Sequence, residues 1–198
     1  ITSYRCHAHG VAVGADPKAL MAELTGKAAG VSKGKGGSMH MFDPAAGYWG
    51  GHGIVGAQVP LGAGIAWARK YMGDDRICLT FMGDGAVNQG AVSESFNIAA
   101  LWGLPVLFII ENNQYGMGTS VARSSAGEQH KRGEAYGIKG QRVNGMDFFA
   151  VYEAVQGALE RIRKGGKPEL IEMVTYRYRG HSMSDPGKYR ERSEIEEW

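Results

Sequence analysis

Two apolar runs end in polar residues: ICLTFMGDG at residues 77–85 and VLFIIENN at residues 106–113. Unbroken apolar runs of this length are typical of strands buried on both faces of a parallel sheet. Residues 86–105 leave room for the helix that connects two such strands. Because the carboxyl ends of neighbouring parallel strands face one crevice, we expect Asp84 and Asn113 to meet there.

An acid and an amide at one sheet edge suit a magnesium ion. Magnesium uses few protein oxygens in near-octahedral geometry and completes its shell with phosphate and water. Asp84 would supply charge and Asn113 a neutral carbonyl, while Gly85, which has no Cβ, would let a diphosphate approach the backbone. The structural alternatives are a turn or helix-capping aspartate and an Asx turn at the end of a strand, and we expect Asn112 to shape that turn.

The rest of the chain alternates helix and strand patterns. Helices are predicted at 18–24, 59–72, 88–102 and 147–164, a short helix at 127–136, and strands at 76–82, 105–111 and 169–178. Loops are predicted at 27–58, 112–126 and 179–192. This alternation predicts an α/β fold with a doubly wound, mostly parallel sheet, as a single domain over residues 1–198.

Composition narrows the class of protein. A formal net charge of +2 gives no electrostatic case for nucleic-acid binding. Cys6 and Cys78 form neither a disulfide framework nor a zinc pattern, which favours a reducing compartment. The apolar runs are too short to span a membrane, and we expect no membrane partner and no targeting segment. The 31 glycines cluster between the periodic segments, as expected for loops that approach a ligand.

The chain resembles a known family. The spacing from Gly83-Asp84-Gly85 to Asn112-Asn113 resembles the thiamin diphosphate motif. Four further segments are similar to the α subunit of the pyruvate dehydrogenase first component: GKGGSMHM at 34–41, GIVGAQ at 53–58, ENNQYGMGT at 111–119 and YRGHSMSDP at 178–186. The resemblance covers nearly the whole chain. Since the family's α subunits are longer, it implies one thiamin diphosphate- and magnesium-binding domain, truncated at both ends.

The resemblance implies a set of site residues. Asp84, Asn113 and the carbonyl of Tyr115 match the magnesium ligands, and Gly85 and Ala86 match backbone contacts to the diphosphate. Tyr4 and Arg5 match the family's pair that binds the cofactor diphosphate, and Gly53 and Val55 match backbone positions that hold the aminopyrimidine ring. His181 matches a histidine near the reacting end of the cofactor, and Ser182 matches a serine that is phosphorylated in mitochondrial relatives. His7 is the best secondary candidate for a catalytic histidine.

The chain departs from the family pattern at two places. The run Pro186-Gly187-Lys188-Tyr189 is one residue shorter than in mitochondrial relatives and lacks their second phosphorylated serine, so it resembles bacterial versions. Ala8 stands where many relatives have glycine. A bacterial-type chain in the cytoplasm is therefore expected, with the mitochondrial matrix as the alternative.

The implied function is thiamin diphosphate-dependent oxidative decarboxylation of pyruvate, with reductive acetylation of lipoyl groups. Thiamin diphosphate supplies an electron sink that side chains cannot provide. In this family the glutamate that activates the cofactor belongs to a partner β subunit, so we expect an α2β2 heterotetramer and a chain that is inactive alone. The lipoyl domain of a dihydrolipoyl acyltransferase is the second expected partner.

Three alternatives stay open. The same fold and cofactor could serve a branched-chain 2-oxo acid or acetoin dehydrogenase α subunit. A non-catalytic nucleotide-binding module of doubly wound type is disfavoured, because neither a Gly-x-Gly-x-x-Gly loop after a strand nor a Walker loop is present. A non-catalytic assembly subunit is disfavoured by the intact pair of Asp84 and Asn113.

Overall fold

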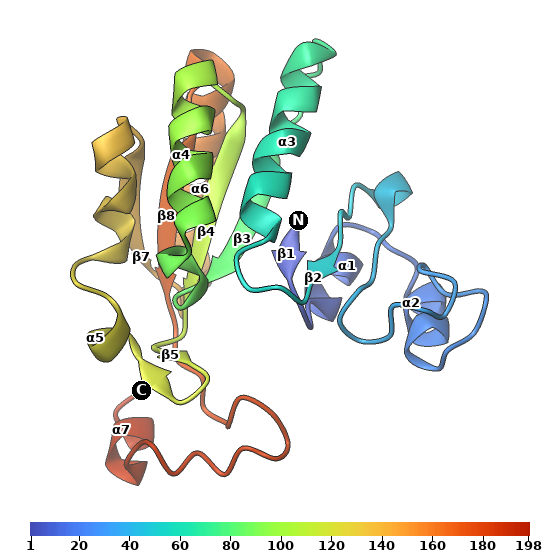
Figure 1. The fold of residues 1–198 in the computed structure, drawn as a ribbon, viewed down its shortest axis with the longest axis vertical. Helices are drawn as coiled ribbons and strands as arrows, with labels where there is room; N and C mark the ends of the chain where they lie inside the picture. The colour runs from blue at the N-terminus through green and yellow to red at the C-terminus, as the bar shows by residue number, and fades with distance from the viewer.

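A computed structural model describes residues 1–198, and its centre is a four-stranded parallel sheet (Figure 1). The strand order is β3-β4-β8-β7, with β3 at Cys78–Gly83, β4 at Val106–Asn112, β8 at Glu169–Val174 and β7 at Lys139–Asn144. Every neighbouring pair in this sheet is parallel. The predicted α/β fold with a mostly parallel sheet is confirmed.

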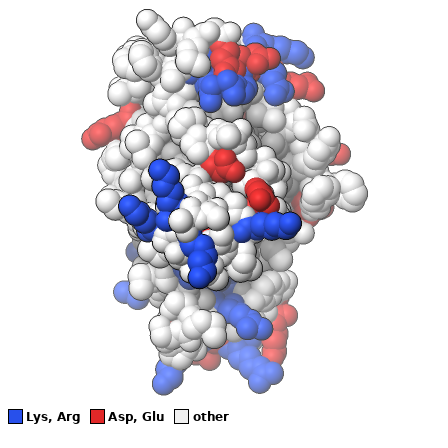
Figure 2. Space-filling view, turned by 90° about the vertical axis from the view of Figure 1, so that its right-hand side faces the viewer, with Lys and Arg blue, Asp and Glu red and all other residues white.

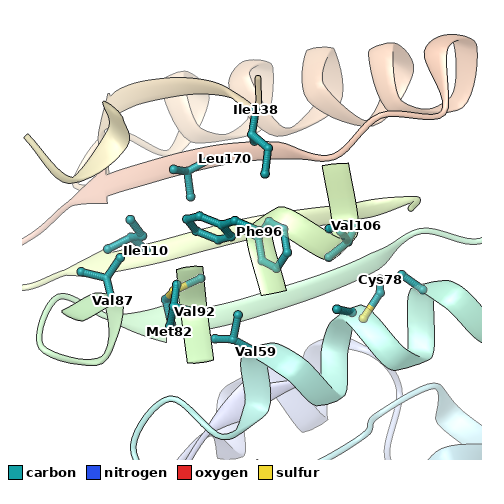
Figure 3. Close-up of a cluster of buried hydrophobic side chains, with 14 of the residues drawn as sticks. Val59, Cys78, Met82, Val87, Val92, Phe96, Val106, Ile110, Ile138 and Leu170 are labelled. Carbon is teal, nitrogen blue, oxygen red and sulfur yellow. The ribbon is translucent and has the colours of Figure 1, made fainter. Parts of the chain in front are cut away.

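Helices cover both faces of the sheet. One face carries α3 (Gln58–Tyr71), α4 (Gly90–Trp102) and the 3₁₀ helix η3 (Gln129–Tyr136), and the other carries α6 (Phe148–Gly165). Two separate apolar clusters fill the two layers. Figure 3 shows the first, in which side chains from α3, α4 and the strands converge. Within this cluster the ring centroids of Phe96 and Phe108 lie 4.7 Å apart.

Capping residues explain where two of the predicted helices begin. The Asp16 carboxylate accepts a hydrogen bond from the Lys18 backbone at 2.9 Å, and Pro17 occupies the first position of α2 (Pro17–Leu24). Asp147 accepts backbone hydrogen bonds at the start of α6, and the helix is followed by its C-cap residue Gly166 in the left-handed conformation. The sequence signals and the observed boundaries agree within one or two residues.

Short elements flank the sheet. They are β1 (Thr2–Ser3), α1 (His7–Ala12), η1 (Pro44–Ala46), β2 (Gly51–His52), η2 (Ala86–Asn88), β5 (Tyr115–Gly116), β6 (Thr119–Ser120), α5 (Val121–Ser124) and α7 (Arg192–Glu196). In Figure 1, β5 and α7 lie beyond the carboxyl ends of the sheet strands. None of the helices combines the length and apolarity that a bilayer crossing needs.

Several predicted boundaries were wrong. Strand β7 was not predicted, because its sequence KGQRVN is polar and it lies at the sheet edge, where only Val143 is buried. The third predicted strand ends at Val174 rather than at residue 178, since the chain turns there into the residues beyond the sheet. The loop predicted at 112–126 contains β5, β6 and α5, and the six-residue helix α1 was also missed.

A long ordered loop is predicted at residues 27–58, and in the structure one buried carboxylate anchors the first part of it. Glu23 of α2 is 0% exposed, and its carboxylate accepts backbone hydrogen bonds from Ser32, Gly34, Gly36 and Gly37 at 2.6–3.1 Å. Burial opposes ionisation, but these four N–H donors outweigh it and lower the pKa of the Glu23 carboxyl. The glycines therefore serve an anchored loop rather than a flexible linker.

Candidate functional site

The carboxyl ends of β3, β4 and β8 border a cavity of about 540 Å³. Strand register pairs Gly83 with Glu111 and Asn112 with Val174, so the residues that follow each strand emerge at one edge. Asp84, Asn113 and Thr175 all line this cavity. The acid and the amide predicted to meet at a sheet edge are therefore in the same cavity.

Asp84 is the most deeply buried of the four charged residues that line the cavity, the others being Arg5, Glu111 and Arg177. It is 2% exposed, and its Oδ2 atom is buried without a hydrogen-bond partner. Burial raises the pKa of the Asp84 carboxyl, and the nearby Arg177 opposes that shift. A buried carboxylate oxygen without a donor is costly, so a cation bound here would supply the missing partner.

Asn113 and Tyr115 present neutral oxygens at the same edge. The Asn113 Oδ1 atom accepts a hydrogen bond from the Tyr115 backbone at 3.3 Å, and the Tyr115 carbonyl accepts one from Arg177 Nη1 at 3.1 Å. Each carbonyl oxygen has a second lone pair that remains able to bind a cation. Asn112 behaves as expected of a turn residue, since its Oδ1 accepts from the Gln114 backbone at 3.0 Å.

The donor set fits magnesium better than a transition metal. No group of three or more His, Cys, Asp or Glu side chains gathers anywhere in the structure. A cation at this edge would be held by one carboxylate and by carbonyl oxygens, with other positions left for phosphate and water. Hard oxygen donors with several open positions are typical of magnesium bound together with a phosphate group.

The backbone at Gly85, next to Asp84, lies close to the backbone at Gly116. A Cβ built on Gly85 would lie 3.6 Å from the Gly116 Cα, and one built on Gly116 would lie 3.9 Å from Asp84 Oδ2. Both glycines line the cavity, as does Ala86. Side chains at these positions would fill space beside the carboxylate, whereas glycine leaves it open to a ligand.

Three predicted site residues from opposite ends of the chain contact one another. Arg5 Nη1 donates to the His181 carbonyl at 2.6 Å, and the Tyr4 hydroxyl lies 3.3 Å from His181 Nε2. Arg5 has φ +57°, a left-handed conformation that non-glycine residues rarely adopt and that clusters at functional sites. Burial lowers the pKa of His181, and Arg5 and Arg177 lower it further, so the imidazole is neutral at pH 7.

Arg177 is a site residue that sequence reasoning missed. The sequence shows it only as part of a basic cluster at 177–192, but its side chain lines the cavity and donates to the Tyr115 carbonyl and the Tyr189 hydroxyl. Its Nε atom is buried and has no hydrogen-bond partner. Together with Arg5 it places two guanidinium groups around the cavity, a charge arrangement that suits a diphosphate.

Some predicted residues lie elsewhere. Val55 lines the cavity but Gly53 does not, and Gly53 packs beside the His40 ring. His7 also lies outside the cavity lining, with Nε2 at 2.9 Å from the Ser38 carbonyl. Ser182 is exposed next to His181, and its hydroxyl is 3.0 Å from that of Ser184.

The C-terminal segment packs against the cavity wall through Glu194. Its carboxylate accepts hydrogen bonds from the Tyr115 and Tyr176 hydroxyls at 2.8–2.9 Å, and the Trp198 ring stacks on Tyr176 with centroids 5.3 Å apart. Burial and the Glu194 carboxylate raise the pKa of Tyr115 to about 12. The segment thus holds the side chain of Tyr115, whose carbonyl accepts a hydrogen bond from Arg177.

Replacing Glu194 by Ala is expected to loosen this segment without unfolding the sheet. Amide hydrogen exchange over 192–198 should become about tenfold faster or more, because a hydrogen bond to a charged group contributes roughly 1.5–3 kcal/mol. Glu196→Ala is the matched control, since that carboxylate lies on the same helix and pairs only with the exposed Arg192. Equal exchange rates in the two variants would contradict the assignment.

Comparisons with known proteins agree with the resemblance in the sequence. The family described as Dehydrogenase E1 component matches residues 1–198. A pyruvate dehydrogenase E1 component subunit alpha from Rickettsia bellii is 60% identical over 197 residues, which cover 99% of this chain and 60% of that protein. The protein of that name from Rhizobium meliloti is 57% identical, with 99% of this chain and 57% of that protein covered.

A mitochondrial relative is similar to the same extent. The somatic-form pyruvate dehydrogenase E1 component subunit alpha from Bos taurus is 56% identical over 199 residues, which cover all of this chain and 50% of that protein. The chain therefore spans about half to three fifths of the length of the curated relatives that it matches.

Proposed function

The chain belongs to the dehydrogenase E1 component family, and from this premise we propose that it is part of the α subunit of a thiamin diphosphate-dependent pyruvate dehydrogenase. The reaction would be oxidative decarboxylation of pyruvate with transfer of the acetyl group to a lipoyl group. Relatives that carry this name at 55–60% identity support pyruvate as the substrate. The unpartnered Asp84 carboxylate oxygen, beside Asn113 in a cavity flanked by arginines, is the observation that carries the proposal.

The residues of this chain would bind and orient the cofactor. Asp84, Asn113 and the Tyr115 carbonyl would hold magnesium, while Arg5 and Arg177 would neutralise the diphosphate. When bound, thiamin diphosphate supplies the electron sink that decarboxylation of a 2-oxo acid requires. The backbone of Val55, with Gly53 nearby, would receive the aminopyrimidine, as the family resemblance implies.

His181 would face the substrate side of the site. Because its pKa is lowered, the imidazole is neutral near pH 7 and one ring nitrogen can accept a proton. Tyr4 and Arg5 fix its position through contacts with the ring and the carbonyl. We propose that it positions pyruvate or the lipoyl group. His7, which lies outside the cavity, is the weaker candidate for a catalytic role.

The α3/α4 face is the proposed contact with a β subunit in an α2β2 assembly. Along these two helices a groove of about 440 Å³ is lined mainly by apolar residues, including Trp67, Ile98 and Trp102. Small residues such as Ala63 and Gly64 allow close approach of another helix there. An exposed apolar groove of this kind is typical of protein–protein contacts. The lipoyl domain of an acyltransferase would be a second, transient partner at the cavity mouth.

Replacing Trp67 by Lys is expected to weaken this assembly about 30-fold, because a buried aromatic anchor contributes roughly 2 kcal/mol or more at an interface. The measurement is sedimentation velocity of the complete α chain with its β subunit. Tyr152→Lys is the control, since that exposed aromatic lies on α6, across the sheet. An unchanged dissociation constant for Trp67→Lys would contradict the proposed contact.

Substrate assays on the complete α chain, with and without the β subunit, test the function. We expect pyruvate to be consumed only with the β subunit, thiamin diphosphate and magnesium present. Preference for a branched-chain 2-oxo acid or for acetoin would assign the site to that substrate instead. Turnover of pyruvate by the α chain alone would contradict the shared site, and cofactor binding without any turnover would indicate an assembly subunit.

The bacterial relatives support a location in the bacterial cytoplasm. The bovine relative, whose name places it in mitochondria, keeps the mitochondrial matrix as the alternative. Fractionation of the source cell would decide between them. Ser182 is exposed, and we propose it only as a candidate regulatory position; mass spectrometry of the natural protein would reveal a phosphate there.

A further inference from the structure

A chain of polar contacts lies behind the Asp84 and Asn113 pair. It consists of Gln129, His130, Glu172 and Asn112, here called the polar bracket. These residues come from η3, β8 and the end of β4. Only Asn112 is part of a recognised sequence motif, so the bracket emerges from the fold rather than from the sequence.

Glu172 is the centre of the polar bracket. It is 3% exposed, and its Oε1 accepts a hydrogen bond from Asn112 Nδ2 at 2.7 Å. Its Oε2 accepts from the His130 backbone N–H at 3.1 Å and lies 3.2 Å from His130 Nδ1. Both carboxylate oxygens are therefore used, and a buried charge is satisfied by groups from two other segments.

Each end of the polar bracket reaches one half of the predicted metal site. Asn112 Oδ1 accepts from the Gln114 backbone and so shapes the turn that carries Asn113 and Tyr115. At the other end, Gln129 Nε2 donates to the Asp84 carbonyl at 3.0 Å. Because Gln129 and His130 are adjacent in the chain, Glu172 connects Asn112, at the end of β4, with Asp84, which follows β3.

The sheet itself does not need these contacts. Strands β4 and β8 are paired from Leu107 to Asn112 by their backbones. The Glu172 hydrogen bonds go to the side chain of Asn112, the last residue of β4, and to His130 of η3, which lies outside the sheet. A carboxylate that only stabilised the strands would have no reason to contact the Asn112 side chain and the His130 backbone together.

We propose that Glu172 is a positioning residue for the metal-binding edge, which sets the placement of the Asn113 and Tyr115 oxygens relative to Asp84. This inference rests on the proposed function, since it takes that edge to be the magnesium site. Groups that orient metal ligands from behind typically change metal affinity by about 10- to 100-fold when they are altered.

Glu172→Gln in the complete α chain assembled with its β subunit tests the inference. Glutamine has one acceptor oxygen, so its NH₂ group must face either the Asn112 NH₂ or the His130 N–H, both of which are donors. We expect the magnesium concentration at half-saturation of thiamin diphosphate binding to rise by about 10-fold or more. At saturating magnesium, kcat should stay within about twofold of the wild type, because the reacting groups are unchanged.

A double variant restores the hydrogen-bond pattern with donor and acceptor exchanged. In Asn112→Asp with Glu172→Gln, the glutamine NH₂ can donate to the new carboxylate, and its oxygen can accept from His130. The carboxylate at 112 still accepts from Gln114. We expect the magnesium concentration at half-saturation, here called the magnesium midpoint, to return to within about threefold of the wild type. A second substitution would not restore this value if the single variant had only lost general stability.

Glu169→Gln is the matched control. Glu169 is a buried glutamate on the same strand, but its carboxylate binds Arg161 of α6, on the other face of the sheet. The melting temperature of the Glu169→Gln variant should fall, while its magnesium midpoint should stay at the wild-type value. Equal midpoints for wild type, Glu172→Gln and Glu169→Gln would overturn the positioning role, as would a double variant no better than the single one.

Failure of the proposed function gives a different result. If wild-type protein showed no magnesium-dependent binding of thiamin diphosphate, the site assignment itself would fail, whatever the variants did. If the wild type binds and Glu172→Gln binds equally well, only the positioning role fails. Calorimetric titration of magnesium at fixed thiamin diphosphate separates the two cases without measuring turnover.

Discussion

Asp84→Asn is expected to weaken magnesium-dependent binding of thiamin diphosphate about 100-fold or more while leaving the fold intact. The substitution keeps the shape of the side chain but removes the buried negative charge from the cavity lining. Loss of one partner of a buried charge pair costs roughly 3–5 kcal/mol, and about 1.4 kcal/mol is a tenfold change in affinity. We therefore expect affinity, measured by calorimetry on the complete assembly, to fall about 100-fold or more.

The stability of the same variant provides an independent readout. Because Asp84 Oδ2 has no partner and burial raises the pKa of that carboxyl, the neutral amide should unfold at an equal or higher temperature when magnesium and cofactor are absent. Asp74→Asn is the control, since that carboxylate pairs with Arg69 and Arg76 away from the cavity. Affinity in Asp84→Asn that matches this control would contradict the metal assignment.

Glu23→Gln is expected to cause the largest loss of stability among the single substitutions considered. The wild-type carboxylate accepts four backbone N–H groups, whereas glutamine has one acceptor oxygen and would turn its NH₂ group toward the remaining donors. Unsatisfied buried donors cost roughly 1–3 kcal/mol each, so we expect the free energy of unfolding to fall by about 3–5 kcal/mol. Chemical denaturation of the complete protein is the measurement.

The Glu23 contribution should also depend on pH. Its folded pKa lies below the unfolded value of about 4.3, so the stabilisation is present above that pH and is lost as pH falls through the folded pKa. The difference in unfolding free energy between wild type and Glu23→Gln should therefore shrink below about pH 4. Glu160→Gln, at an exposed position on α6, should show neither effect. A constant difference down to pH 2 would contradict a role for the ionised carboxylate.

The central strands and the metal-binding edge could be predicted because their signals are local. Unbroken apolar runs identify β3 and β4 as parallel strands, and parallel pairing then brings the residues after each strand to one edge. Only β4 is buried almost throughout, because β3 is the edge strand and alternates buried and half-buried residues. Nothing beyond strand order was needed to bring Asp84 and Asn113 together. By contrast, β7 has a polar sequence that becomes a strand only because β8 offers it a backbone edge to pair with.

Contacts that depend on side chains from three or more segments could not be predicted. In the sequence, Arg177 looks like one member of a solvated basic cluster, but the segment that follows β8 places it in the cavity lining. Glu172 looks like an ordinary polar interruption of an apolar strand. Glu23 is one glutamate in a short amphipathic helix, with no local sign of the four N–H groups that it receives. Charged residues in otherwise apolar surroundings were the available signal, since such residues are rarely buried without partners.

Manganese can replace magnesium and be located by anomalous scattering, which makes one crystal structure the decisive measurement. The crystal would hold the complete α chain, its β subunit, thiamin diphosphate and Mn²⁺. We predict a single anomalous peak within coordination distance of the Asp84 carboxylate, the Asn113 side-chain oxygen and the Tyr115 carbonyl, with diphosphate oxygens beside Arg5 and Arg177. A cofactor bound with its metal at any other residues would contradict the account of this sheet edge.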